Sequence, residues 1–331
     1  MKNIQYYIVL VFAGILLASC QKEIEFSGEY TEPLVVVNSY LIPESTVQVH
    51  LSKSRFFLDN KRGFDWIENA VVEITINGDS TETLSHSQQG FYIGNYRPQA
   101  GDSISLNVQV PGFDDITSTT VVQPKSNIIS VDTIAKKLVD RYPSYYIDDE
   151  VVGYSAYYEY EIGIRIKDPE AVKNYYRLTV KQRGYSVQDS TQFYEYNLYF
   201  TLKGVSSETT SSVFEEFMEN TNNDEHVFND ELFNGKESVL QFTYGNSQLE
   251  VVPGKEEYFE DYGFTNNNPY DLIINLQSTN RDSYLYFKTK MAAEQVFETV
   301  FTEPVQIHTN ITNGVGIFGT LTDHKVTLKN R

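Results

Sequence analysis

The feature that most constrains the fold is an alternation of apolar and polar residues with period two. From Pro33 onward, apolar side chains take every second position in short runs such as 47–51, 72–76 and 104–110. Successive side chains of a β-strand point to opposite faces, so this pattern predicts half-buried strands. Asn77-Gly78 and Pro111-Gly112 supply turns between them. Residues 32–124 are therefore predicted to form an Ig-like or transthyretin-like β-sandwich.

A second β-rich domain with one or two helices is predicted over residues 125–331. Aromatic residues make up 14% of the chain, with 25 Tyr, 20 Phe and one Trp, and this composition favours strands. Further strands are expected at 162–166, 176–180, 193–202, 238–244 and 271–277.

The remaining segments of this half give three other signals. Residues 125–152 mix a short strand pattern with Tyr, Pro and acidic residues and are interpreted as a connection between the domains. Tyr284, Phe287 and Met291 form a stripe at helical spacing, which predicts a helix over 282–299. A capping box at Ser212 and Glu215 predicts another over 212–220. Polar residues predict exposed loops at 220–230 and 256–268.

The N-terminus has the pattern of a lipoprotein signal peptide. Lys2 precedes an apolar run from Ile8 to Leu17, and Ala18-Ser19 then precede Cys20. The run is too short to span a bilayer, so residues 1–19 are expected to be removed on export. Cys20, the only cysteine, is the predicted lipidation site, and residues 20–31 are expected to be a polar tether. Acyl chains such as palmitate would then hold the protein on outer-membrane lipid.

Charge and motif spacing argue against several kinds of chemistry. A formal net charge of −19 disfavours nucleic acid as a partner. No two of the five histidines lie three to five residues apart, so no metal site is predicted. Gly314, Gly316 and Gly319 match the spacing of a dinucleotide loop, but too few residues follow for that unit, and a turn or close backbone approach is expected instead. No catalytic residue and no cofactor are predicted.

Two concentrations of tyrosine are the candidate binding surface. Rigid amphipathic rings bind sugars, peptides or partner proteins, whereas cross-strand pairing is the commoner structural use of tyrosine. Adjacent tyrosines on a strand cannot both face one core, which favours exposure of some of them. The candidate residues are Tyr145, Tyr146, Tyr157, Tyr158, Tyr194 and Tyr196.

Several blocks of the sequence resemble a family of Bacteroidota outer-membrane lipoproteins defined only as a domain of unknown function (DUF4249-like). The matching blocks are Leu34–Val37, Asn69–Val72, Gly90–Tyr92, Phe228–Lys236, Ser283–Tyr286, Glu303–Val305 and Thr309–Gly319. The resemblance implies a companion of TonB-dependent receptors in nutrient uptake, with no established catalytic residue to carry over. Lys22, Glu23 and Glu25 are similar to the acidic signal that sends such lipoproteins to the cell exterior, although Ile24 interrupts the acids.

The expected function is that of a lipid-anchored, surface-facing accessory or ligand-binding protein that works with a TonB-dependent transporter in the outer membrane. Its expected ligand is a small molecule, a glycan or a peptide. Residence facing the periplasm is the alternative location. A surface hydrolase acting on glycan or peptide, and a structural or adhesive envelope lipoprotein, are the alternative functions.

Overall fold

A computed structural model describes residues 32–56, 62–170, 172–185, 192–203, 222–260, 270–297 and 305–330. The predicted signal peptide, Cys20, the export signal at Lys22, Glu23 and Glu25, and the predicted helix at 212–220 lie outside these residues. Within them, no helix is long and apolar enough to cross a membrane.

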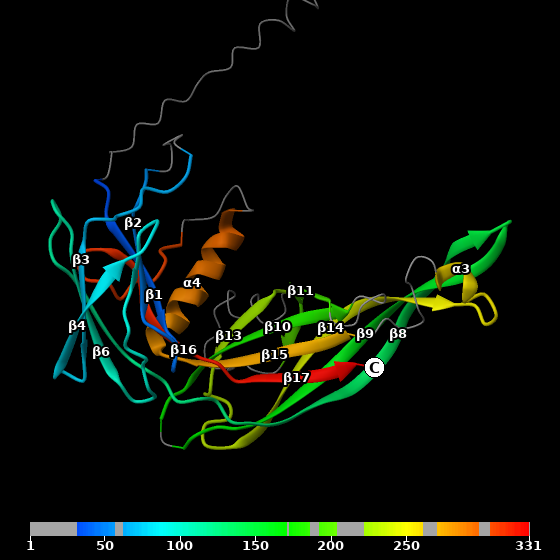
Figure 1. The fold of residues 1–331 in the computed structure, drawn as a ribbon. Helices are drawn as coiled ribbons and strands as arrows, with labels where there is room; N and C mark the ends of the chain where they lie inside the picture. Colours follow the sequence, from blue (N-terminus) through cyan, green and yellow to red (C-terminus); the bar gives the residue numbers. More distant parts are fainter. Residues whose placement is uncertain are drawn as a thin grey trace, which may run out of the picture. The chain divides into compact units, whose positions relative to one another are not determined.

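The first part of the described chain consists of strands joined by turns and longer connections (Figure 1). Asn77 and Gly78 both have positive φ in the turn between β3 and β4, as the sequence predicts. Gly112, with φ of 87°, lies in the turn from β6 to β7. The strands are β1 (Val35–Leu41), β2 (Gln48–Lys53), β3 (Val71–Ile76), β4 (Ser80–His86), β5 (Phe91–Ile93), β6 (Ser103–Gln109) and β7 (Ile116–Val121).

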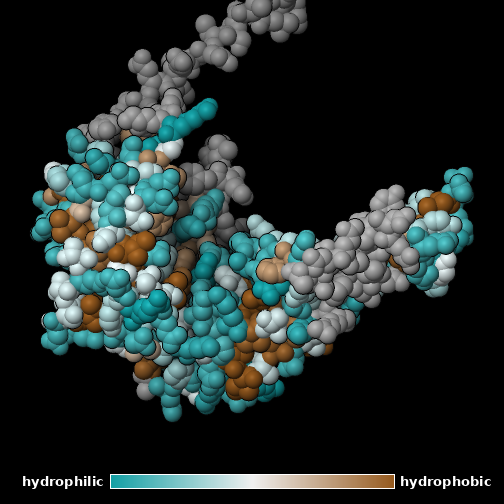
Figure 2. All heavy atoms as spheres, viewed as in Figure 1, coloured by the Kyte–Doolittle hydropathy of each residue, from teal (hydrophilic) through white to brown (hydrophobic). Residues whose placement is uncertain are grey.

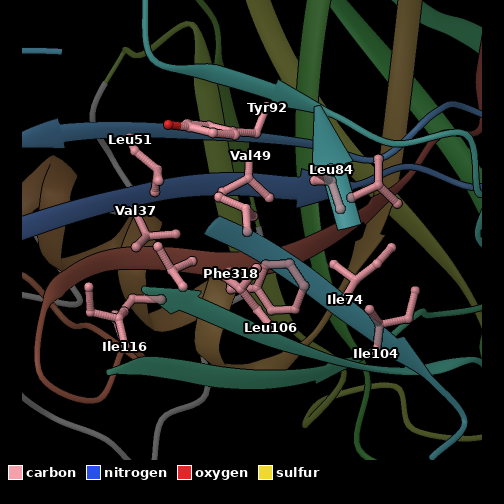
Figure 3. Packing of buried hydrophobic residues seen from close by; sticks show 14 of the residues in the cluster. Val37, Val49, Leu51, Ile74, Leu84, Tyr92, Ile104, Leu106, Ile116 and Phe318 are labelled. Carbon is pink, nitrogen blue, oxygen red and sulfur yellow. The ribbon is translucent and has the colours of Figure 1, made fainter. Parts of the chain in front are cut away.

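These strands enclose one hydrophobic core, because the alternate apolar residues of each strand face inward. The hydrogen-bonded order β1-β2-β5-β4-β3-β6-β7 folds over this core as a sandwich. Figure 3 shows Val49 and Leu51 of β2 facing Ile74 of β3 and Leu106 of β6. The ring of Phe318 lies among them, although it comes from the far end of the chain.

The second part of the described chain contains ten strands and two helices. Its strands are β8 (Ile128–Ile147), β9 (Glu150–Lys167), β10 (Tyr175–Tyr185), β11 (Phe193–Asn197), β12 (Thr201–Lys203), β13 (Glu225–Asn229), β14 (Glu237–Val251), β15 (Tyr270–Thr279), β16 (Val315–Thr322) and β17 (Lys325–Asn330). The helices are α3 (Glu257–Glu260) and α4 (Arg281–Phe297), and α4 confirms the predicted helix at 282–299 over its described residues.

A second core lies between two groups of strands in this part. The four-stranded sheet β12-β14-β9-β8 contributes residues such as Ile162, Ile164 and Phe242. Strands β10 and β15 contribute Leu178 and Leu272 from the other side. The predicted fold class, mainly β with an N-terminal β-sandwich and a second β-rich part with helices, is therefore confirmed.

Strand β16 joins the two ends of the described chain. It pairs with β15 and, in parallel, with β1, where Val37 lies opposite Gly316. Ile311 and Phe318 are buried in the first core as a result. The domain boundary predicted at residue 124 stays a prediction, but residues of the closing segment belong to the first core.

Three interpretations of the sequence are wrong in whole or in part. In the predicted exposed loop at 256–268, Glu257–Glu260 form helix α3, and Phe259 is buried. Residues 125–152 are not a connection, because β8 takes up 20 of them and pairs with β9 along its length. Residues 225–229 are not an exposed loop, because they form β13, which pairs with β10. His226, interpreted as part of that loop, is 5% exposed. These last two segments are strands because they pair with another strand: β8 with β9, the next strand in sequence, and β13 with β10.

Candidate functional site

The hairpin of β8 and β9 carries most of the exposed apolar side chains of the second part. β8 is the terminal strand of its sheet, and its residues are nearly all exposed or half-buried. We call the following residues the hairpin surface; each is between 37 and 58% exposed: Ile134, Leu138, Val139, Tyr142, Tyr145, Tyr146, Ile147 and Tyr157. Figure 2, drawn from the same side as Figure 1, shows hydrophobic residues exposed at the far end of this hairpin.

The backbone of β8 is poorly suited to pairing with another strand. Its register against β9 shifts at five places, and each shift interrupts the regular hydrogen-bonding edge. Two features of β8 are common in edge strands that do not pair further. Lys136 and Lys137 add charge, and Pro143 lacks a backbone N–H to donate. A partner is therefore expected to contact the side chains of this strand rather than to extend the sheet.

The charge of β8 differs from that of the whole chain. Asp132 and Asp140 are balanced by Lys136, Lys137 and Arg141, whereas the whole protein has a formal net charge of −19. A high density of acidic side chains therefore does not explain why β8 is exposed. The hairpin surface thus combines exposed apolar side chains with charges of both signs, a composition found at protein interaction sites.

Four of the predicted tyrosines lie on this hairpin, in different surroundings. Tyr145, Tyr146 and Tyr157 are all exposed, and the ring of Tyr145 also packs edge-on against Phe259 with centroids 5.4 Å apart. Tyr157 covers the face of Gly245, since a Cβ on that glycine would lie 1.7 Å from the tyrosine hydroxyl. The absence of a side chain at Gly245 thus lets the Tyr157 ring pack directly on the backbone of β14.

Tyr158 has a structural role. Its hydroxyl donates to Glu250, which also accepts from Arg141 Nε at 2.7 Å. The bond to Glu250 raises the pKa of Tyr158 to about 12, and the bonds from Tyr158 and Arg141 lower the pKa of Glu250. Lys136 Nζ lies 4.1 Å from the centroid of the Tyr158 ring. These contacts tie β8 to β9 and β14.

Tyr194 and Tyr196 belong to another sheet, on β11. Their rings stack with centroids 6.3 Å apart and an interplanar angle of 11°. Tyr194 covers Gly184 of β10, its direct partner in the sheet. The structure therefore divides the six predicted tyrosines into a hairpin group and a β11 group.

The aliphatic part of the hairpin surface was not among the predicted site residues. Ile134, Leu138 and Val139 fall in the segment that was interpreted as a connection. The run Ile134-Ala135-Lys136-Lys137-Leu138-Val139 does contain the apolar residues, but a strand exposed on both faces has no burial pattern of period two to reveal it. Within the described residues, no group of three or more His, Cys, Asp or Glu side chains is placed to hold a metal ion.

The fold and this surface define a mainly β protein built from packed sheets, with an exposed apolar hairpin. A family model described as "Domain of unknown function (DUF4249)" matches residues 21–327, and the chain belongs to this family. No match was found among curated proteins. A solved structure from a study of the promiscuous specificity of carbohydrate-binding modules of the β-sandwich superfamily aligns with 67% of this chain and 96% of its own, at 8% identity and a TM-score of 0.21.

Proposed function

We propose that this protein is a non-catalytic, lipid-anchored accessory protein of the outer membrane, facing the cell exterior, that binds a TonB-dependent transporter and assists its uptake of a nutrient. The observation that carries the proposal is the hairpin surface: eight exposed apolar or aromatic side chains on a hairpin whose outer strand, β8, has little net charge. Monomeric soluble proteins rarely expose contiguous apolar area without a binding role.

The choice of partner follows from family membership and from the sequence. Membership in the DUF4249 family supports the resemblance that implies companions of TonB-dependent receptors. The signal-peptide pattern ending at Cys20 supports attachment to the same membrane as such a receptor. Aromatic and large aliphatic side chains dominate the energy of protein interfaces, so Leu138, Val139 and Tyr146 are the proposed contacts.

The test is co-purification of the transporter with the lipidated protein from outer membranes in mild detergent. The triple variant Leu138→Ser, Val139→Ser and Tyr146→Ser removes the centre of the hairpin surface and is expected to reduce recovered transporter about tenfold or more. The matched control is Val71→Ser with Val121→Ser, two similarly exposed valines of the first sheet, which should leave recovery unchanged. Equal recovery with the triple variant and wild type would refute the docking role.

The lipid anchor has its own test. Cys20→Ser removes the proposed acylation site, and the protein should then appear in the soluble fraction. Two acyl chains hold a protein on a membrane stably, whereas the polar tether at residues 20–31 offers little apolar area. Circular dichroism of the released variant should match that of wild type. Retention in the membrane, or an unmodified N-terminus in mass spectrometry of the native protein, contradicts the proposal.

A further inference from the structure

A polar groove lies on the outer face of the second part, away from the hairpin surface. It has a volume of about 390 Å³ and is lined by residues of β10, β11, β13, β15 and β17. On β10 the even-numbered residues face the hydrophobic core and the odd-numbered ones face the groove. Because the strands are in register, the groove residues form rows: Glu225, Thr179, Asn275 and Lys325 are cross-strand neighbours in one row.

The charged side chains of the groove pair with one another. Arg177 bonds to Glu225, and Arg183 Nη2 lies 2.6 Å from Glu195 Oε1. Lys325 Nζ lies 2.7 Å from Asp323 Oδ2. With Lys181 and Asp224, the lining holds four cationic and four acidic side chains. The groove is therefore electrically balanced, which disfavours both anions and cations as ligands.

A continuous hydrogen-bond network fixes these groups. Arg177 Nη1 donates to Gln277 Oε1 at 2.7 Å, and Gln277 Nε2 donates to Asp323 Oδ1 at 2.6 Å. Asn275 Nδ2 donates to the same carboxylate oxygen at 3.0 Å. Although burial raises the pKa of Asp323, the bonds from Asn275, Lys325 and Gln277 lower it below its usual value. Asp323 thus stays ionised and orients both amides at neutral pH.

Asn275 has an unused acceptor in this network. The residue is only 8% exposed, and its Oδ1 is buried without a hydrogen-bond donor from the described protein groups. A flipped amide would not pair this oxygen, because it would turn Oδ1 instead of Nδ2 toward the Asp323 carboxylate. Buried polar groups are normally paired, and an exception calls for an explanation such as an absent ligand. Oδ1 itself has almost no accessible surface, so a donor from a ligand reaches it only with a small shift of the groove side chains around it.

An aromatic ring lies beside the groove. Phe193 is on β11, two residues from Glu195, and so faces the same side of the sheet. The guanidinium of Arg183 lies 4.7 Å from the centroid of its ring. The side chain is 56% exposed, so one ring face is available for stacking. Ile273 is the one apolar residue of the groove lining, which makes a hydrophobic ligand a poor fit.

We infer that this groove binds a neutral oligosaccharide, with hydroxyl groups of one sugar unit on the Thr179–Asn275 row and the ring of another against Phe193, which lies opposite Tyr185 and roughly 20 Å further along β10. A sugar hydroxyl can both donate and accept a hydrogen bond, so it can pair with the amide, carboxylate and cationic side chains that line the groove. A peptide would find its main-chain partners at a sheet edge rather than on the face of a sheet. This inference rests on the proposed function in that the sugar is the captured nutrient, but binding in the groove does not require the transporter.

The test uses the full lipidated chain in a detergent without a sugar headgroup. Probes are neutral oligosaccharides of glucose, xylose and mannose, with polygalacturonate and a tryptic peptide mixture for comparison, measured by calorimetry. At least one neutral oligosaccharide should bind. Asn275→Leu and Phe193→Ala should each weaken its binding about tenfold or more. Tyr199→Ala, a similarly exposed aromatic outside the groove lining, should leave binding unchanged.

Three results would overturn the inference: no binding by any neutral oligosaccharide, stronger binding of the acidic polymer or the peptides, or affinity unchanged in both groove variants. A Thr179→Val variant keeps the volume of the side chain and removes only its hydroxyl, so weakened binding there supports the inference even where Asn275→Leu folds poorly. The groove variants should still recover the transporter as wild type does. Failure of sugar binding and failure of docking are thus separate outcomes.

Discussion

At Gly316 the backbone approaches a neighbouring strand so closely that no side chain fits. Its φ is 110°, and a Cβ at this position would lie 2.0 Å from the carbonyl oxygen of Val37, its partner in the parallel pairing of β1 and β16. The glycine at position 316 thus serves a close backbone approach, as the sequence predicts.

Gly316→Ala should lower the free energy of unfolding by about 2–4 kcal/mol, because it combines an unfavourable φ with a clash against backbone. Gly101→Ala is the matched control, since Gly101 has φ of 95° but nothing within 4 Å of an added Cβ. It should cost about 1 kcal/mol. Urea denaturation followed by the fluorescence of Trp66, the single tryptophan, measures both. Equal costs for the two variants would mean that the contact with Val37 is unimportant.

His226 makes stability depend on pH. Burial lowers its pKa below 6.5, and its Nε2 lies 2.9 Å from the carbonyl oxygen of Phe200, which accepts from the neutral ring. The unfolded chain therefore binds more protons than the folded one as the pH falls below 6.5. This contribution to stability is complete above pH 6.5 and is lost as the pH falls toward the folded-state pKa, with a slope of at most about 1.4 kcal/mol per pH unit.

The expected result is a denaturation midpoint that falls between pH 7 and pH 5. His324, whose pKa burial also lowers, should contribute to the same fall. His226→Gln keeps a hydrogen-bond donor and has no titrating ring, so its midpoint should fall less over this interval. A variant with the same pH dependence as wild type would show that His226 is not the group responsible.

Single residues were partly predictable. Exposure of Tyr146 and Tyr157 follows from the rule that adjacent strand residues face opposite sides. The unused acceptor of Asn275 was not predictable, because it depends on Asp323, which is 48 residues away and fixes the amide. A network made by side chains from four strands and from the turn before β17 leaves no periodic signal in the sequence.

Helix α4 shows how one element is fixed at its start. Asn280 precedes the helix, and its Oδ1 accepts from the backbone N–H of Ser283 at 3.0 Å. Its Nδ2 donates to Thr120 Oγ1 of β7 at 2.8 Å. The residue thus caps the helix and also attaches it to the first sandwich.

Asn280→Ala should destabilise the protein by about 1–2 kcal/mol, since it removes the cap and leaves Thr120 without this donor. Asn280→Asp retains the capping acceptor and should cost less. Thermal unfolding followed by circular dichroism compares the two variants. If Asp proved as harmful as Ala, the bond to Thr120 would be the main contribution and not the cap.

The elements differ in how well the sequence predicts them. Strands such as β3 and β6 have one buried face, and their alternation gave their positions to within a residue or two. β8 was missed because its side chains are exposed on both faces, so that its stability comes from pairing with β9 rather than from its own pattern. The same exposure makes β8 the candidate docking element.

At the scale of the whole molecule, the two ends of the described chain fold together. β16 follows the second part in sequence but pairs with β1 and buries Phe318 in the first core. A domain boundary predicted from alternation alone cannot include such a segment. The local sequence of a strand does not show whether it pairs with the next strand or with one about 280 residues away. The first sandwich is thus complete only when the closing segment has been synthesised.

Phe318→Ala should therefore destabilise the first sandwich although the residue lies near the C-terminus. The ring is fully buried, and its removal leaves a cavity that should cost about 3–5 kcal/mol. Trp66 lies in the first part, and its fluorescence should report a lower urea midpoint in this variant. The matched control is Phe242→Ala, an equally buried ring of the second core. If the midpoint reported by Trp66 fell with Phe242→Ala but not with Phe318→Ala, the closing strand would not support the first core.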